Sequence, residues 1–213
     1  MYWGAYASSV FGVQRVEVLG ASPDVVREVQ ATTNDLLGRS LVAVDAADVE
    51  GKIRALPSVA GVSVDRAFPH TLRIKIAPEK AVAVARRGHS SWLVTGSGKV
   101  IREIATGSER SLPRVWLGRG VPVTLGVALP AIYTPATRAL AAARDEKLPR
   151  RVKAIRSTGG TLVLVLRHGP EIRLGEGTDL ALKAAVATVV FRLAGSDATY
   201  IDVSVPERPV AGH

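Results

Sequence analysis

The first third of the chain shows two spacings of apolar residues, one typical of strands and one typical of helices. Apolar and polar residues alternate over 13–19, whereas 22–37 and 45–56 repeat apolar side chains every three or four positions. The expected elements are a strand at 13–19, helices at 22–37 and 45–56, and strands at 59–68 and 71–76 joined by a turn at Pro69-His70. Two helices on one face of a small sheet form an α+β module with the order β-α-α-β-β.

The remaining residues predict a second module, a mixed β-domain with a packing helix. The expected elements are a hairpin and connector at 87–125, a helix at 135–148, strands at 152–155, 161–166 and 171–174, a helix at 179–193, and a last strand at 200–205. The strand at 161–166 is almost continuously apolar, so we expect it to be buried on both faces.

The helix at 179–193 is expected to have one apolar face. We expect its buried face to consist of Leu182, Val186, Val189, Val190 and Leu193. Lys183 and Arg192 are expected to lie outside that face.

The first fourteen residues contain no charge but include Tyr2, Trp3 and Tyr6. The apolar run is shorter than the roughly 20 residues of a membrane span, and no basic residue precedes Arg15, as a signal peptide would require. Two interpretations stay open. One is the outer end of a membrane helix whose first half is missing, since Tyr and Trp gather at bilayer interfaces. The other is a short soluble extension that packs on the first module.

Charge is distributed unevenly along the 213 residues, whose formal net charge is +9. Residues 12–86 are nearly neutral, so most of the positive charge lies in the distal half. A basic chain favours an anionic partner, which includes nucleic acid, anionic lipid and acidic protein. The absence of cysteine excludes disulfide scaffolds, thiol catalysis and Cys-ligated metal sites.

One basic cluster stands out, because ten successive residues, 147–156, contain five cations and no acid. The cations are Lys147, Arg150, Arg151, Lys153 and Arg156. Three interpretations remain open: a solvated loop or strand edge, a face near anionic lipid or acidic polymers, and a nucleic-acid site. The last would usually include aromatic stacking platforms, and no aromatic residue lies near the cluster.

Candidate catalytic groups do not form a recognisable site. None of the four histidines, His70, His89, His168 and His213, pairs with another at helical spacing. Gly96-Ser-Gly-Lys99 resembles part of a phosphate-binding loop, but Leu93 and Val100 stand where glycine and Ser or Thr are needed, so we expect a hairpin turn. The acidic cluster Asp45, Asp48 and Glu50 is explained by capping of a helix N-terminus. We therefore expect no catalytic, cofactor-binding or metal site among these residues.

Several short motifs occur in one order along the chain. They are Ala55-Leu-Pro-Ser-Val59, Val64-Asp-Arg66, Phe68-Pro69, Thr71-Leu-Arg-Ile-Lys-Ile76 and Pro78-Glu79-Lys80-Ala-Val-Ala83. This series resembles the POTRA (polypeptide-transport-associated) domain of the FtsQ/DivIB cell division family. It departs from the family pattern at Lys80, where arginine is usual, and at Ala81, where proline is usual.

The distal motifs resemble the FtsQ-type β-domain. They are Gly169, Ile172, Leu174-Gly175, Asp179, Lys183 and Tyr200-Ile201-Asp202. The resemblance implies the outer end of a truncated transmembrane helix at 1–11, a POTRA domain at 12–86, an FtsQ-type β-domain at 87–206 and a C-terminal tail at 207–213.

By this resemblance, the chain would be a non-enzymatic divisome scaffold in bacterial septation. It would be a single-pass protein of the cell membrane, anchored by an N-terminal helix, with its C-terminal domain extracytoplasmic at the division septum. Its partners would be FtsB/FtsL-like coiled-coil proteins and the FtsW/FtsI synthase pair, with no nucleic acid and no small-molecule substrate.

Partner binding would occur through sheet edges of the POTRA domain and of the last strand, by addition of a partner strand. The resemblance implies partner-binding residues Val203, Val205, Glu207 and Arg208, although the two valines would equally suit core packing. Two alternative functions remain: a POTRA-containing secretion or assembly component, and a basic nucleic-acid-binding protein.

Overall fold

The computed structural model describes residues 11–194 and 198–212, which form four α-helices and twelve strands in two sheets. The α+β class expected from the sequence is confirmed. The chain divides into two compact units, residues 1–79 and 80–213. The expected membrane segment at 1–11 lies outside the described residues except for Phe11. Among the described helices, none combines the length and the apolar character needed to cross a membrane.

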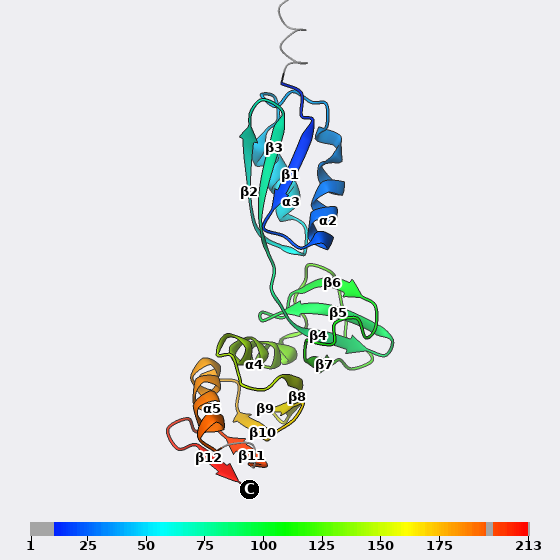
Figure 1. The fold of residues 1–213 in the computed structure, drawn as a ribbon. Helices are drawn as coiled ribbons and strands as arrows, with labels where there is room; N and C mark the ends of the chain where they lie inside the picture. Colours follow the sequence, from blue (N-terminus) through cyan, green and yellow to red (C-terminus); the bar gives the residue numbers. More distant parts are fainter. Residues whose placement is uncertain (1–10, 195–197, 213) are drawn as a thin grey trace, which may run out of the picture. The chain divides into compact units, whose positions relative to one another are not determined.

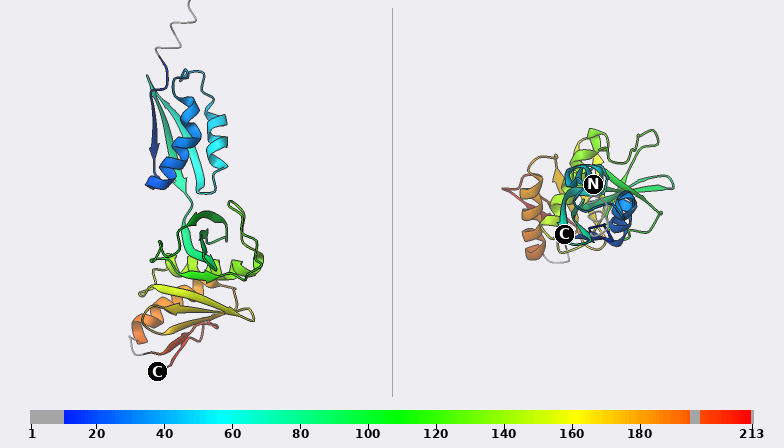
Figure 2. Two further views of the ribbon diagram at one scale, coloured as in Figure 1. Left: turned by 90° about the vertical axis from the view of Figure 1, so that its right-hand side faces the viewer. Right: turned by 90° about the horizontal axis from the view of Figure 1, so that it is seen from above.

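The first unit has the expected β-α-α-β-β order. Its elements are β1 (Arg15–Leu19), α2 (Pro23–Thr33), a short 3-10 turn (Asn34–Leu36), α3 (Ala46–Arg54), β2 (Val59–Ala67) and β3 (Thr71–Pro78). β3 lies in the middle of the sheet, parallel to β1 and antiparallel to β2. Both helices cover the same face of this sheet (Figures 1 and 2), so each buries one apolar side against it.

The core of the first unit follows the periodicity of its sequence. Val29 on α2, Val49 and Ile53 on α3, and Leu72 and Ile74 on β3 are buried in one cluster. On the opposite face of the sheet, Arg73 of β3 pairs with Glu17 of β1 at 2.8 Å. The hydrogen bond and the negative charge of Glu17 raise the pKa of Arg73 above its ordinary value.

Gly20 shows why the first strand ends where it does. Its backbone is left-handed, with φ 82°, and a Cβ built there would lie 2.5 Å from the carbonyl oxygen of Ile76. Only glycine combines this conformation with such a close approach of two backbones. The chain can therefore leave the sheet and enter α2 directly.

The second unit holds a nine-stranded sheet with two helices. Its elements are β4 (Ala81–Arg87), β5 (Ser90–Thr95), β6 (Val100–Ile104), β7 (Arg114–Trp116), a 3-10 turn (Ala131–Tyr133), α4 (Thr134–Asp145), β8 (Val152–Thr158), β9 (Thr161–Leu166), β10 (Glu171–Gly175), α5 (Leu180–Ala194), β11 (Tyr200–Asp202) and β12 (Val210–Gly212). The spatial order is β12-β11-β10-β9-β8-β7-β4-β5-β6. Residues 81–86, assigned to the first module from the sequence, form most of β4, which pairs with β5 and β7 here.

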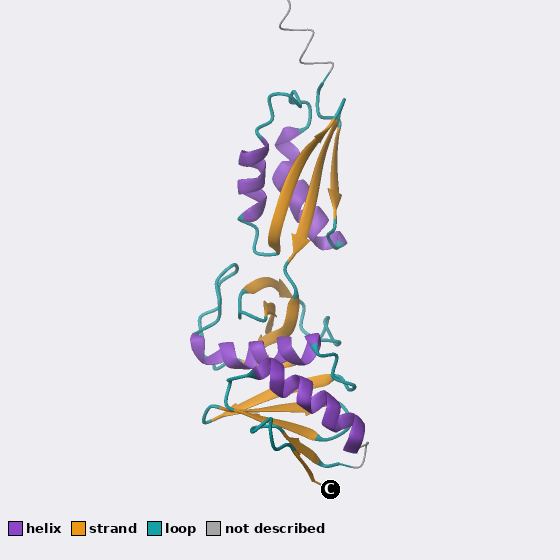
Figure 3. Cartoon of the chain, turned by 90° about the vertical axis from the view of Figure 1, so that its left-hand side faces the viewer, coloured by secondary structure: helices purple, strands orange, loops and turns teal. Residues whose placement is uncertain are grey.

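Helices α4 and α5 pack against each other, and both contact the sheet (Figure 3). Small side chains on both helices, including Ala139 and Ala143 of α4 and Ala184 and Ala187 of α5, are buried. The expectation that 161–166 is buried on both faces is wrong. Leu162, Leu164 and Leu166 are buried, but Val163 and Val165 between them are only half-buried, because the helices cover one side of β9.

The predicted buried face of α5 is wrong for three of its five residues, since only Val186 and Val190 pack, half-buried, against the core. The structure buries Leu180, Lys183, Ala184, Ala187, Thr188 and Phe191, and it leaves Leu182, Val189 and Leu193 exposed. Lys183, expected outside the core, is only 3% exposed, and its ammonium donates to the carbonyl of Glu176 at 3.0 Å. Small residues let α5 approach the sheet and α4 closely, which favours this face over the bulkier one.

The last strand is shorter than predicted, and it is not the edge of its sheet. β11 ends at Asp202, where the Asp202 carboxylate accepts hydrogen bonds from the backbone and hydroxyl of Ser204 and turns the chain. β12, within the stretch expected to be a tail, returns antiparallel and pairs with β11. The edge strands of the described sheet are therefore β12 and β6.

Candidate functional site

An exposed apolar strip runs along α5. Leu182, Val189 and Leu193 are exposed, and Leu193, at 82%, is the most exposed large hydrophobic side chain of the described chain. Val186, half-buried, lies between them on the same side of the helix. The spacing 182, 186, 189 and 193 alternates steps of four and three residues, which is the spacing of a coiled-coil seam. We call these four residues the α5 strip.

The four residues expected to bind a partner lie in or near the loop between β11 and β12. Val203 is 0% exposed, and its backbone donates to Arg173 of β10 at 2.9 Å, so its side chain belongs to the core. Val205, Glu207 and Arg208 are exposed, with a turn closed by a hydrogen bond from the Arg208 N–H to the Val205 carbonyl at 3.0 Å. Only these three are accessible to another protein.

Tyr200 and Gly212 determine how closely the edge strand β12 packs against β11. The two residues are register partners, and a Cβ built on Gly212 would lie 2.2 Å from the Tyr200 ring. Arg173 also lies over that ring, with its guanidinium carbon 4.1 Å from the ring centroid. β12 therefore requires glycine at this position to lie flat against β11.

Sequence reasoning missed both β12 and the exposure of the α5 strip. Val210 and Ala211 were too few to indicate a strand in a stretch containing Pro206 and Pro209. Heptad spacing of Leu182, Val189 and Leu193 could have indicated a helix-docking seam, but the same spacing is also typical of a core face.

The basic cluster at 147–156 occupies the connector from α4 to β8 and part of β8. Arg156 pairs with Glu171 on β10 across the sheet. Lys147, Arg150, Arg151 and Lys153 are exposed. The cluster is thus split: one cation is used within the sheet and four are presented to solvent.

The catalytic candidates set aside from the sequence have structural roles. Gly96 to Lys99 forms the turn between β5 and β6, as expected, with the Gly98 N–H donating to the Thr95 carbonyl at 3.0 Å. Asp45 caps α3 by accepting from the Ala47 N–H at 2.9 Å, which confirms its capping role. Across residues 11–194 and 198–212, no group of three or more His, Asp or Glu side chains is placed to hold a metal ion.

Comparison with known proteins relates the chain to bacterial cell division. Residues 11–77 match the family model described as "POTRA domain, FtsQ-type". The cell division protein FtsQ of Streptomyces venezuelae is 31% identical over 217 residues, which covers 98% of this chain and 77% of that protein. The FtsQ proteins of Streptomyces bingchenggensis and Streptomyces coelicolor are each 26% identical, over 99% and 98% of this chain and 80% and 81% of theirs.

Proposed function

Because this chain belongs to the FtsQ family of cell division proteins, we propose that it is a non-enzymatic scaffold that recruits and regulates other membrane proteins of the division septum. In this proposal an N-terminal helix anchors it in the cell membrane as a single-pass protein, and both described units are extracytoplasmic. Its partners are FtsB/FtsL-like coiled-coil proteins and the FtsW/FtsI synthase pair.

The observation that carries the proposal is the exposed α5 strip. A helix that leaves Leu182, Val189 and Leu193 in solvent keeps apolar area that burial against another helix would remove from water. Its heptad spacing matches the seam of a coiled-coil partner, whose own apolar residues would fit between those of the strip. The strip is thus a docking face for one helix of such a partner.

The edge strand β12 and the loop before it form a second contact. An extended segment of a partner pairs with the free edge of β12, and Val205, Glu207 and Arg208 supply side-chain contacts beside it. Val203 contributes indirectly, because its buried side chain anchors the start of this loop to the core. Val205 provides an apolar contact and Glu207 and Arg208 provide charges of opposite sign.

Co-purification with a co-expressed FtsB/FtsL-like partner tests the proposal. The double variant Val189→Asp with Leu193→Asp places two charges in the seam, so we expect partner recovery to fall by at least about tenfold. Ile132→Asp is the matched control, since Ile132 is 77% exposed in the same unit but lies outside the strip. Equal recovery of the double variant and the control would show that α5 is not the docking face.

The edge contact is tested with Val210→Pro and Ala211→Pro. Successive N–H groups of a strand point to opposite sides, so one of these prolines removes a donor from the free edge and the other removes one that faces β11. We expect the variant that loses the free-edge donor to bind the partner more weakly while its melting temperature stays unchanged. Undiminished binding by both variants would exclude strand addition at β12.

A further inference from the structure

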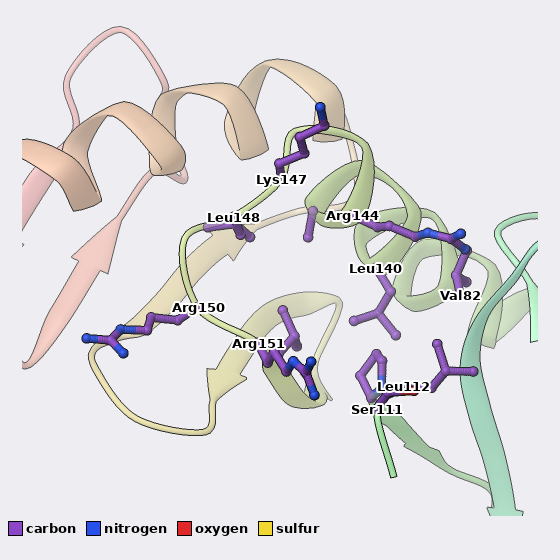
Figure 4. A pocket seen from close by; sticks show the side chains of 12 residues that line it. Val82, Ser111, Leu112, Leu140, Arg144, Lys147, Leu148, Arg150 and Arg151 are labelled. Carbon is purple, nitrogen blue, oxygen red and sulfur yellow. The ribbon is translucent and has the colours of Figure 1, made fainter. Parts of the chain in front are cut away.

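A cavity of about 260 Å³ opens in the second unit beside the C-terminal end of α4 (Figure 4). Its floor is apolar, with Val82, Leu140 and Ala143 buried and Leu112 and Leu148 half-buried. The volume is below the roughly 300–1,000 Å³ of typical small-molecule sites. The cavity is therefore sized for one or two apolar side chains rather than for a large cofactor.

The rim of this cavity is basic. Arg144, Lys147, Arg150 and Arg151 line it, and Arg144 is held in place by donating to the carbonyl of Ala81 at 2.7 Å. Figure 4 shows Arg151 beside Ser111 and Leu112, while Lys147 and Arg150 extend outward. None of the four forms an ion pair with a residue of the described chain. Their positive charge is left for an occupant to neutralise.

Lys147 reaches the rim through an unusual backbone conformation. It has φ 50° just after α4, a left-handed position where glycine is favoured. The Leu148 N–H donates to the Ala143 carbonyl at 3.2 Å and the Lys147 N–H donates to the Arg144 carbonyl at 3.1 Å. This helix end places Leu148 in the cavity wall and the charge of Lys147 at its opening.

We propose that this cavity binds an acidic peptide segment of a partner protein. One apolar side chain of the segment enters the cavity, and flanking carboxylates pair with the guanidinium groups of the rim. Arginine suits this role because its planar fork binds a carboxylate through two parallel hydrogen bonds. The site shares no residue with the α5 strip or with the loop before β12, so the inference does not depend on the function proposed above.

A peptide accounts for the cavity better than a membrane surface does. Binding in a bilayer interface uses apolar side chains that project outward, whereas Val82, Leu140 and Ala143 lie at the bottom of a recess. A flat anionic surface would contact the rim charges and leave the apolar floor empty. Nucleic acid is disfavoured as well, because the lining residues include no aromatic side chain for base stacking.

Fluorescence anisotropy with the 213-residue chain tests the inference, using a labelled peptide of glutamates and aspartates with one central leucine. Arg151→Glu reverses a rim charge, so we expect it to weaken binding by at least about tenfold. Lys153→Glu makes the same charge change on β8 outside the cavity, and we expect an effect of at most about twofold because the screened long-range field alone changes.

A second pair of reagents tests the apolar floor. Ala143→Leu fills the cavity without altering its charge, and the same peptide with a central alanine lacks the anchor. We expect both to weaken binding. Circular dichroism melts verify that Ala143→Leu is folded, and if it is not, the exposed Arg151 variant and the alanine peptide still decide the question.

Vesicles containing phosphatidylglycerol complete the experiment. Vesicle binding that is lost in Arg151→Glu but kept in Lys153→Glu, without peptide binding, would overturn the peptide assignment in favour of a membrane. The inference is equally overturned if no peptide binds, if the leucine and alanine peptides bind alike, or if Arg151→Glu and Lys153→Glu behave the same.

Discussion

Helices α3 and α5 differ in how clearly their sequences indicate the buried side. On α3, Val49 and Ile53 are buried, and the remaining surface carries the ion pairs Asp48–Lys52 and Glu50–Arg54. On α5, apolar residues occur all round, and Lys183 is buried while Leu193 is exposed. An amphipathic pattern identifies the core face only when charged residues occupy the opposite face.

The two sides of α5 also differ in role, because one stabilises the fold and the other is available to a partner. The inner side of α5 uses small residues such as Ala184 and Ala187, which allow close approach to α4 and the sheet. The outer side uses larger ones such as Leu182 and Leu193, which contribute less to this fold because half or more of their surface stays in water. We infer that the outer residues are retained for a partner.

The largest loss of stability is expected from a substitution at Ile53. Ile53→Ala removes a side chain that is 0% exposed on the single apolar face of α3, so we expect the free energy of unfolding of the first unit to fall by about 2–5 kcal/mol. Urea denaturation followed by amide hydrogen exchange in the first unit measures it. Lys52→Ala, on the exposed side of the same helix, is the control and should change stability by less than about 0.5 kcal/mol.

A smaller loss of stability is expected from a substitution on the inner side of α5. Ala187→Leu inserts a large side chain where α5 is fully buried, so overpacking should destabilise the second unit by about 1–3 kcal/mol. Urea denaturation followed by amide hydrogen exchange in the second unit measures this change. Ala181→Leu, on the exposed side of α5, is the matched control. A stabilising effect of Ala187→Leu would contradict the close packing of α4 and α5.

The smallest effect on folding is expected at the outer side. Leu193→Ala removes a side chain that is already in solvent, so the free energy of unfolding should change by less than about 0.5 kcal/mol. Thermal unfolding of the isolated chain measures this, while co-purification reports any loss of partner binding. A marked destabilisation of the isolated chain would mean that Leu193 packs within the fold.

The sequence predicted the first unit well because its patterns were local. Alternation over 71–76 placed Leu72 and Ile74 on the buried face, and both are buried. Asp45 was assigned as a helix cap from its position alone, and the Ala47 N–H does donate to it. The predicted start of α2 was correct, although Ser22 makes no side-chain capping bond.

The four residues expected to bind a partner do not share one environment. Val203 is in the core, and Val205, Glu207 and Arg208 in the following loop are exposed. The edge of the sheet was expected at 200–205, but β12 covers β11 and becomes the edge itself. A three-residue strand such as β12 carries too little periodicity to be recognised.

The sequence by itself determined the α+β class, the order of most elements and the family to which the chain belongs. Those properties depend on spacing and on short motifs that are read along the chain. The tertiary structure alone decided which side of α5 is buried, which strand ends the second sheet and that Arg144 and Arg151 meet at one cavity. Each of these depends on packing between segments far apart in sequence. Side-chain volume and backbone pairing between those segments decide which of several arrangements forms, although the local sequence is compatible with all of them.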